Sequence, residues 1–212
     1  MNFNVNGIFN PQNRFWSFIE KIVNLCVLSF LWLLFSLPIV TAGAATTAMF
    51  QYTLKLARDE EGYVWQTFWK GFKQNFVQAT VLWILMAAAG AFLVLDLYCC
   101  QFLPFPGTVK WAARVVLVSL LFVYLLTSLY VFPLAAFFRV TLKKAVVHSF
   151  IMAVGNLYVS VTIMVIYGIF AVITYFLPEF FMVWFTIASY ASSHLFGSVF
   201  RKYMENDIKT ES

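Results

Sequence analysis

The chain has 212 residues, of which 62% are hydrophobic and only 11% are charged, and its net charge is +5. Soluble domains carry about 25% charged residues, so this composition excludes an ordinary water-soluble protein and predicts lipid as the main solvent. The basic residues flank the apolar runs instead of forming one block, which argues against nucleic-acid binding and is typical of membrane proteins. We expect one integral membrane domain over residues 1–212.

Charge-free stretches mark the predicted membrane segments, because a spanning helix needs about 20 apolar residues. We expect an all-α fold: a polytopic transmembrane helical bundle with five to six membrane segments and one interfacial amphipathic helix. The segments are predicted at about 19–37, 41–57, 76–98, 113–137, 149–177 and 180–200.

The first charge-free run, 22–54, is long for one helix and short for two, and Pro38 lies near its middle. Proline disfavours helical geometry in the residue before it, so we interpret the run as a hairpin whose short second segment either spans or is re-entrant. The positive-inside rule favours this arrangement. It leaves only Lys110 and Arg114 on the outer face and places both termini in the cytoplasm, whereas a single span would place the N-terminus outside.

An amphipathic helix is predicted at 63–76, where aromatic residues recur at spacings of three and four. Such a helix lies in the membrane plane, with its aromatic rings in the acyl boundary and its lysines among headgroups. It serves either as an anchor that orients the next span or as a docking surface for a partner protein. The residues predicted to form this surface are Trp65, Phe68, Trp69, Lys70, Phe72 and Lys73.

Two ionisable residues are candidates for a polar or ligand site. A charged side chain within a span is a functional hypothesis by default, and Asp96 lies near the end of its span. His194, in the last span, is a titratable group that either faces a polar groove or bonds a neighbouring serine or carbonyl. For Asp96 the structural alternative is an aspartate at the outer headgroups.

Small residues recur in two of the predicted spans at spacings that allow helices to approach closely. These positions are expected to form close helix contacts within one bundle or, alternatively, with a second copy of the chain or another membrane protein. The predicted packing positions are Gly43, Ala44, Ala48, Ser189, Ser193 and Gly197.

No catalytic, metal-binding or cofactor-binding constellation is recognisable in the sequence. The chain has no Ser-His-Asp arrangement, HExxH helix, GxSxG elbow or phosphate loop. Cys26, Cys99 and Cys100 have neither metal-ligand spacing nor the pattern of a disulfide framework. We therefore expect no enzyme activity and no cofactor, and an intramembrane enzyme is the weakest hypothesis.

The first hairpin and the helix that follows resemble the YesL family of bacterial, mostly Gram-positive, integral membrane proteins. Val131-Phe132-Pro133-Leu134 followed by Arg139 is a weaker match. The main matching positions are Leu31-Trp32-Leu33-Leu34, Ser36-Leu37-Pro38, Thr41, Gly43, Ala45-Thr46-Thr47-Ala48, Arg58–Gly62 and Phe72-Lys73-Gln74-Asn75-Phe76.

The resemblance implies a small polytopic protein of a bacterial plasma membrane with an accessory role near a sugar importer of the ABC type. On this hypothesis the chain contacts the bilayer and the importer's permease or ATPase subunits, or a second copy of itself. The alternative is a self-contained channel or carrier for small solutes. The resemblance brings no established catalytic or binding residues.

Overall fold

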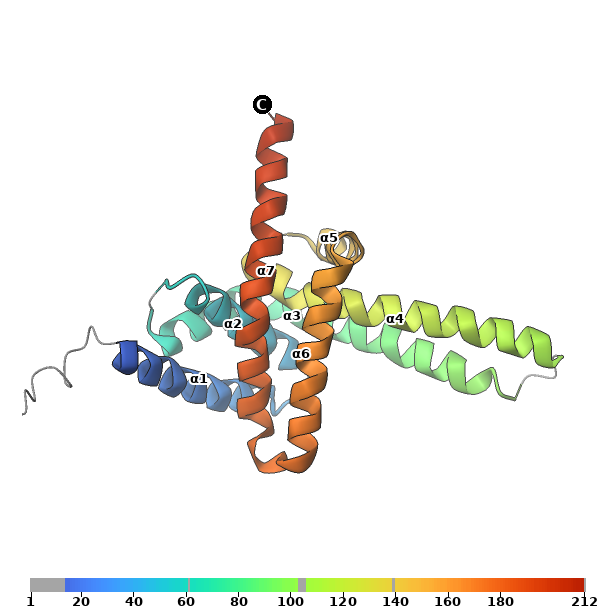
Figure 1. Cartoon of the computed structure of the whole chain (residues 1–212), viewed down its shortest axis with the longest axis horizontal. Helices are drawn as coiled ribbons and strands as arrows, with labels where there is room; N and C mark the ends of the chain where they lie inside the picture. The colour runs from blue at the N-terminus through green and yellow to red at the C-terminus, as the bar shows by residue number, and fades with distance from the viewer. Residues whose placement is uncertain (1–13, 61, 103–105, 139, 212) are drawn as a thin grey trace, which may run out of the picture.

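A computed structural model describes residues 14–60, 62–102, 106–138 and 140–211. Helices account for nearly all of these residues, as predicted for an all-α protein (Figure 1). In chain order the elements are α1 Arg14–Ser36, α2 Ala42–Leu56, α3 Val64–Cys99, α4 Gly107–Phe137, α5 Leu142–Gly155, α6 Leu157–Phe176, the 3-10 turn η2 Pro178–Phe180 and α7 Phe181–Glu211.

The predicted hairpin at Pro38 is present. α1 ends at Ser36, and α2 begins at Ala42 after a turn in which Ile39 adopts a positive φ of 38°. The Thr41 hydroxyl donates to the Phe35 carbonyl at 2.6 Å, which satisfies one of the carbonyls left free at the end of α1. Farther from the turn, Trp32 Nε1 donates to Thr46 Oγ1 at 3.1 Å and ties the two helices together.

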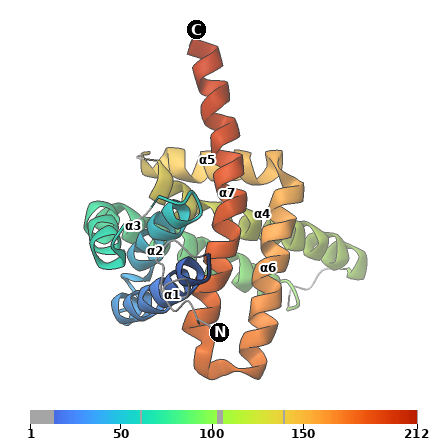
Figure 2. The ribbon, with the colours of Figure 1, turned by 60° about the vertical axis from the view of Figure 1, so that its left-hand side comes forward.

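α2 is the central helix of the molecule. It packs against α1, α3, α4 and α7, and most of its residues are buried, including Ala44, Ala48 and Met49 at 0% exposure. Figures 1 and 2 show it enclosed by longer helices. Its composition fits this position, because a run of alanine, threonine and glycine lets neighbouring backbones approach closely.

The small residues predicted to pack helices do so at most positions. A Cβ atom on Gly43 would lie 2.5 Å from both the Ala79 carbonyl oxygen and Trp83 Cβ, so α2 and α3 cross here almost backbone to backbone. On α7, Ser193 is fully buried with its hydroxyl oxygen 2.9 Å from Thr53 Oγ1 of α2.

Ser189 is also fully buried, with its hydroxyl 3.2 Å from that of Tyr167 on α6. Gly197 does not mark a close helix crossing within the bundle, because a Cβ placed there would meet no atom within 4 Å. Packing of Gly197 against a second copy or another membrane protein stays a prediction.

The prediction of an interfacial helix at 63–76 separated from a span at 76–98 is wrong. Residues 64–99 form one continuous helix, α3. No proline interrupts it, and Gly71 alone does not stop a helix whose neighbours pack against α2. The aromatic stretch is therefore the first part of a 36-residue helix.

The long helices point in two directions. α3 and α4 form an antiparallel arm that extends away from the rest of the fold, whereas α6 and α7 form a second hairpin that lies across it (Figure 1). Within the arm, the Tyr124 hydroxyl donates to the Met86 carbonyl at 2.6 Å, beside Gly90. A tight turn around Glu179 forms η2 between α6 and α7, and the last turns of α7 project beyond the other helices (Figures 1 and 2).

The predicted segment 149–177 covers parts of two helices rather than one. The chain breaks at Asn156, whose backbone leaves the helical region at φ −128° and ψ 51°, so that α5 ends there and α6 begins. Polar groups hold the break together. The Ser160 hydroxyl lies 2.8 Å from the Ala153 carbonyl oxygen and 3.0 Å from the hydroxyl of Tyr130 on α4.

Four helices in the described residues have the length and hydropathy of membrane spans, namely 16–36 of α1, α3, α4 and α6. Their side chains are largely exposed on the molecule, which is expected of helices whose outer faces contact lipid. The predicted segments 41–57 and 180–200 are not among the four. α2 has only 15 residues, and α7 carries a row of serines and His194 in its apolar part.

Candidate functional site: a basic pocket beside the central helix

The aromatic residues predicted to form an interface on 63–76 divide into two groups. Phe68 is 0% exposed and Phe72 is 8% exposed, and both belong to the buried hydrophobic core. The Phe35 ring of α1 lies 5.6 Å from the Phe68 ring and 5.0 Å from the Phe72 ring, between centroids. The placement of Phe68 and Phe72 on a membrane or partner surface is therefore wrong, because helix packing has already covered that face.

The remaining four residues do form a surface at the start of α3. Trp65 is 51% exposed and stacks on Trp69 at 5.7 Å between ring centroids. The Lys73 ammonium lies 4.7 Å from the centroid of the Trp69 ring, a cation–π contact. Lys70 is exposed beside them. We call Trp65, Trp69, Lys70 and Lys73 the tryptophan–lysine surface; whether it binds a partner stays a prediction.

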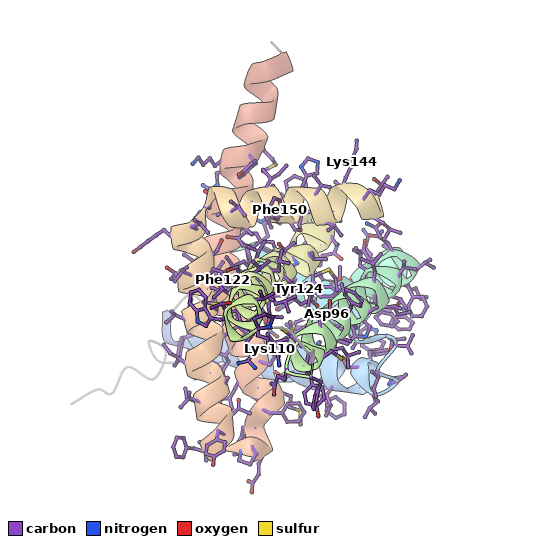
Figure 3. All side chains as sticks on the ribbon, turned by 90° about the vertical axis from the view of Figure 1, so that its right-hand side faces the viewer. Asp96, Lys110, Phe122, Tyr124, Lys144 and Phe150 are labelled. Atoms are coloured by element: carbon purple, nitrogen blue, oxygen red, sulfur yellow. The ribbon has the colours of Figure 1, made fainter. Side chains whose placement is uncertain are left out.

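Asp96 and His194 do not share a site. Asp96 is half-buried and lines a hollow of about 710 Å³ between α3 and α4, together with Cys99, Cys100 and Ala113. Figure 3 views the molecule along the arm and shows Asp96 and Lys110 there, with Lys144 on α5 above them. All three cysteines are free.

His194 is exposed on α7 with its ring 5.1 Å from that of Tyr190. It lies near an ion pair in which the Lys21 ammonium of α1 bonds Asp59 Oδ1 at 2.8 Å. The hydrogen bond from Lys21 and its charge hold the pKa of Asp59 below its ordinary value, and the nearby His194 adds to this. This exposed cluster joins α1, α7 and the loop after α2.

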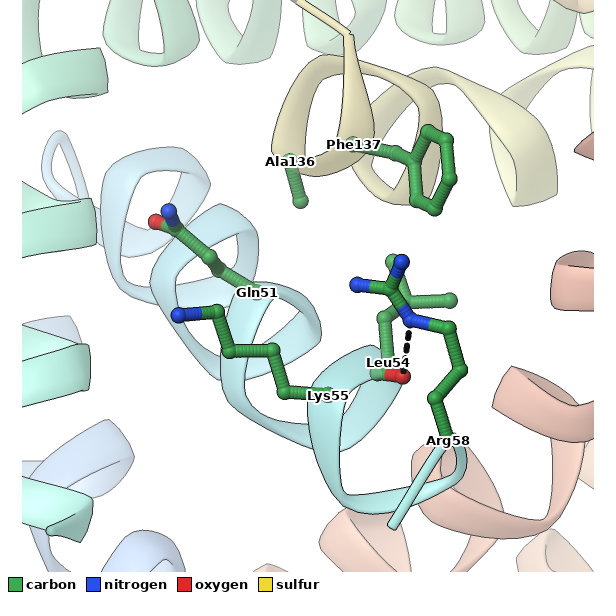
Figure 4. Close-up of a pocket in the computed structure, with 6 residues that line it drawn as sticks. All are labelled: Gln51, Leu54, Lys55, Arg58, Ala136 and Phe137. Atoms are coloured by element: carbon green, nitrogen blue, oxygen red, sulfur yellow. Dashed lines mark hydrogen bonds between the residues drawn. The ribbon is translucent and has the colours of Figure 1, made fainter. Parts of the chain in front are cut away.

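A pocket that the sequence did not predict lies where the C-terminal end of α2 meets the C-terminal end of α4 (Figure 4). Its volume is about 310 Å³. The residues that line it are Gln51, Leu54, Lys55 and Arg58 from the α2 side and Ala136 and Phe137 from α4. Both of the charged lining residues are basic, so we call it the basic pocket.

The Arg58 side chain is held in a defined orientation. Its Nε donates to the Leu54 carbonyl oxygen at 3.2 Å, as Figure 4 shows, and its guanidinium carbon lies 5.1 Å from the centre of the Phe137 ring. One Nη atom lies 3.3 Å from a carboxylate oxygen of Glu60 at the rim. Stacking on an aromatic ring together with a fixed hydrogen bond is a role that suits arginine better than lysine.

Gln51 contributes a polar group that lacks a partner. Its side-chain oxygen is buried without a hydrogen bond among the described residues. The group is pressed against Gly71 of α3, where a Cβ atom would lie 2.1 Å from Gln51 Oε1. Figure 4 shows the Lys55 side chain extending to the same side of α2 as Gln51.

The spacing of Lys55 and Arg58 gave a weak signal for this pocket. Residues three apart share a helix face. In the sequence, however, Lys55 and Arg58 are explained equally well as positive charges that flank a membrane segment on its cytoplasmic side. Phe137 and Ala136 come from a helix about 80 residues away, and nothing local indicates that they pack beside α2.

The described residues define an all-α protein and include four helices of membrane-spanning length and composition. Residues 25–97 match the family described as "Protein of unknown function, DUF624". The chain is also similar to "Uncharacterized protein YesL" of Bacillus subtilis (strain 168), with 28% identity over 153 residues, 70% of this chain and 69% of that protein. No solved structure matches the chain significantly. The two sequence matches confirm the predicted resemblance to a YesL-like family.

Proposed function

We propose that the chain is a non-enzymatic accessory or assembly component of a bacterial plasma membrane, with both termini in the cytoplasm. We propose further that it associates with a carbohydrate importer of the ABC type through the permease or ATPase subunits. The observation that carries the docking role is the tryptophan–lysine surface. Tryptophan side chains that remain exposed after their neighbours enter the core are typical of protein interfaces.

The alternative of a self-contained channel or carrier has less support. Its two named polar residues lie in different places, Asp96 in the hollow between α3 and α4 and His194 on α7 near Asp59. The link to carbohydrate uptake comes from the resemblance to the YesL family, and it is tested by identifying the partner.

The test is purification of the tagged full chain from its own host in mild detergent, with quantitative mass spectrometry of what is recovered. We expect permease or ATPase subunits of a carbohydrate importer. The double variant Trp65→Ala/Lys70→Gln should reduce their recovery at least several-fold, because it removes an exposed aromatic anchor and a charge. Trp111→Ala, at an exposed tryptophan on α4, is the matched control and should leave recovery unchanged.

Two results would count against the proposal. Recovery of the chain alone, or only of a second copy of itself, in several mild detergents would remove the importer partner. Equal recovery of importer subunits with the double variant would keep the partner but exclude the tryptophan–lysine surface as the contact.

A further inference from the structure

The charge in the basic pocket is poorly balanced. Lys55 Nζ makes no hydrogen bond or ion pair within the described part of the chain, and Arg58 forms an ion pair only with Glu60. The side chain of Glu60 is 50% exposed, and exposed ion pairs of this kind are weak. No carboxylate is among the residues that line the pocket.

The end of α2 opposes this positive charge only in part. A helix C-terminus is equivalent to roughly −0.5 of an elementary charge, whereas Lys55 and Arg58 together carry two positive charges. Arg58 already donates to the Leu54 carbonyl, so one of the free carbonyls of the helix end is satisfied. The pocket therefore stays positive.

The donors are also arranged before any ligand arrives. Arg58 is held by Leu54 and by the Phe137 ring, and its guanidinium lines the same pocket as Lys55. Gln51 also lines the pocket, but its unpartnered atom is the side-chain oxygen, an acceptor that lies against Gly71 and cannot donate to an anion. Guanidinium and ammonium groups that line one pocket without a carboxylate are usual ligands of phosphate oxygens.

We propose that the basic pocket binds a phosphate group, with Arg58 and Lys55 as the charged donors. A volume of about 310 Å³ lies at the lower end of small-ligand pockets and suits one phosphate-bearing headgroup. That chemistry is shared by an anionic lipid and by a free phosphorylated solute. The proposal does not depend on the importer partner, because its residues lie outside the tryptophan–lysine surface.

The test is calorimetric titration of the purified, delipidated full chain in a neutral detergent. The probes are inorganic phosphate, a short-chain phosphatidylglycerol and, for comparison, a short-chain phosphatidylcholine. We expect saturable binding of at least one of the two anionic probes and weaker binding of the zwitterionic one. Binding to phosphatidylglycerol alone identifies a lipid headgroup, and binding to inorganic phosphate identifies a soluble phosphate compound.

Four variants make the test specific. Lys55→Gln should weaken binding about ten-fold, the usual effect of losing one charge-assisted hydrogen bond. Ala136→Glu should abolish it by placing a carboxylate among the pocket's cations, whereas Lys55→Arg should retain it. Lys110→Gln, which makes the same charge change at the far end of the arm, should bind as the wild type does.

The proposal is overturned if the wild type binds neither anionic probe. It is equally overturned if Lys55→Gln and Ala136→Glu, eluting as folded protein in gel filtration, both bind with unchanged affinity.

Discussion

Replacing Gly43 with alanine is expected to destabilise the protein strongly, because the added methyl group has no space. It would lie 2.5 Å from the backbone oxygen of Ala79 and 2.5 Å from Trp83 Cβ. Neither atom is the far end of a flexible side chain, so α2 and α3 must move apart. Overpacking of this kind costs about 1–3 kcal/mol, which corresponds to a fall in Tm of roughly 2–10 °C for a chain of this size.

The measurement is thermal unfolding of the purified variant in mild detergent, and Gly197→Ala is the matched control. A Cβ at Gly197 meets nothing within 4 Å, and alanine is up to about 1 kcal/mol more favourable than glycine within a helix. We therefore expect an unchanged or slightly raised Tm for the control. Equal Tm values for the two variants would contradict the close crossing of α2 and α3.

Phe68→Ala is expected to have the second large effect. The ring is fully buried and packs against Phe35 of α1 and Phe72 of its own helix. Truncating a buried phenylalanine typically costs about 3–5 kcal/mol, because the lost contacts are not replaced when the cavity collapses only in part. The free energy of unfolding should therefore fall by about 3 kcal/mol, measured by chemical or thermal denaturation in detergent.

Trp65→Ala provides the comparison, since Trp65 lies only three residues earlier on α3 but is 51% exposed. Surface substitutions usually change stability by no more than about 0.5 kcal/mol. If the two variants lost the same stability, Phe68 would not be in the core. A surface helix would then explain the aromatic pattern better.

Sequence reasoning succeeded where one residue type dictates the local geometry. The proline at position 38 predicted the break between α1 and α2, and the run of small residues after it predicted close packing, which Gly43, Ala44 and Ala48 show. These signals are local, and tertiary contacts do not override them.

Prediction from the sequence failed where the burial of a side chain or the end of a helix depends on contacts between distant segments. An aromatic face at helical spacing suits both a membrane surface and a protein core, and only the position of Phe35 decides between them for Phe68 and Phe72. Likewise, the hydrogen bond between Ser160 and Tyr130, close to the break at Asn156, joins α6 to a distant part of the sequence. The basic pocket joins two helix ends that are far apart in the chain, so neither end indicates it alone.

The central claim is that α2 is a buried helix held between α3 and α7, and a disulfide across α2 and α7 tests it most directly. The hydroxyl oxygens of Thr53 and Ser193 lie 2.9 Å apart, close enough for cysteines at both positions to bridge. The experiment uses the full chain in native membranes, with Cys26, Cys99 and Cys100 replaced by serine.

The account predicts rapid intramolecular cross-linking of Thr53→Cys/Ser193→Cys on mild oxidation. The control pair, Thr53→Cys/Ser198→Cys, should not cross-link, because Ser198 is exposed on α7. The reverse order of rates, or no cross-link in the Thr53/Ser193 pair, would contradict the placement of α2 at the centre of the fold.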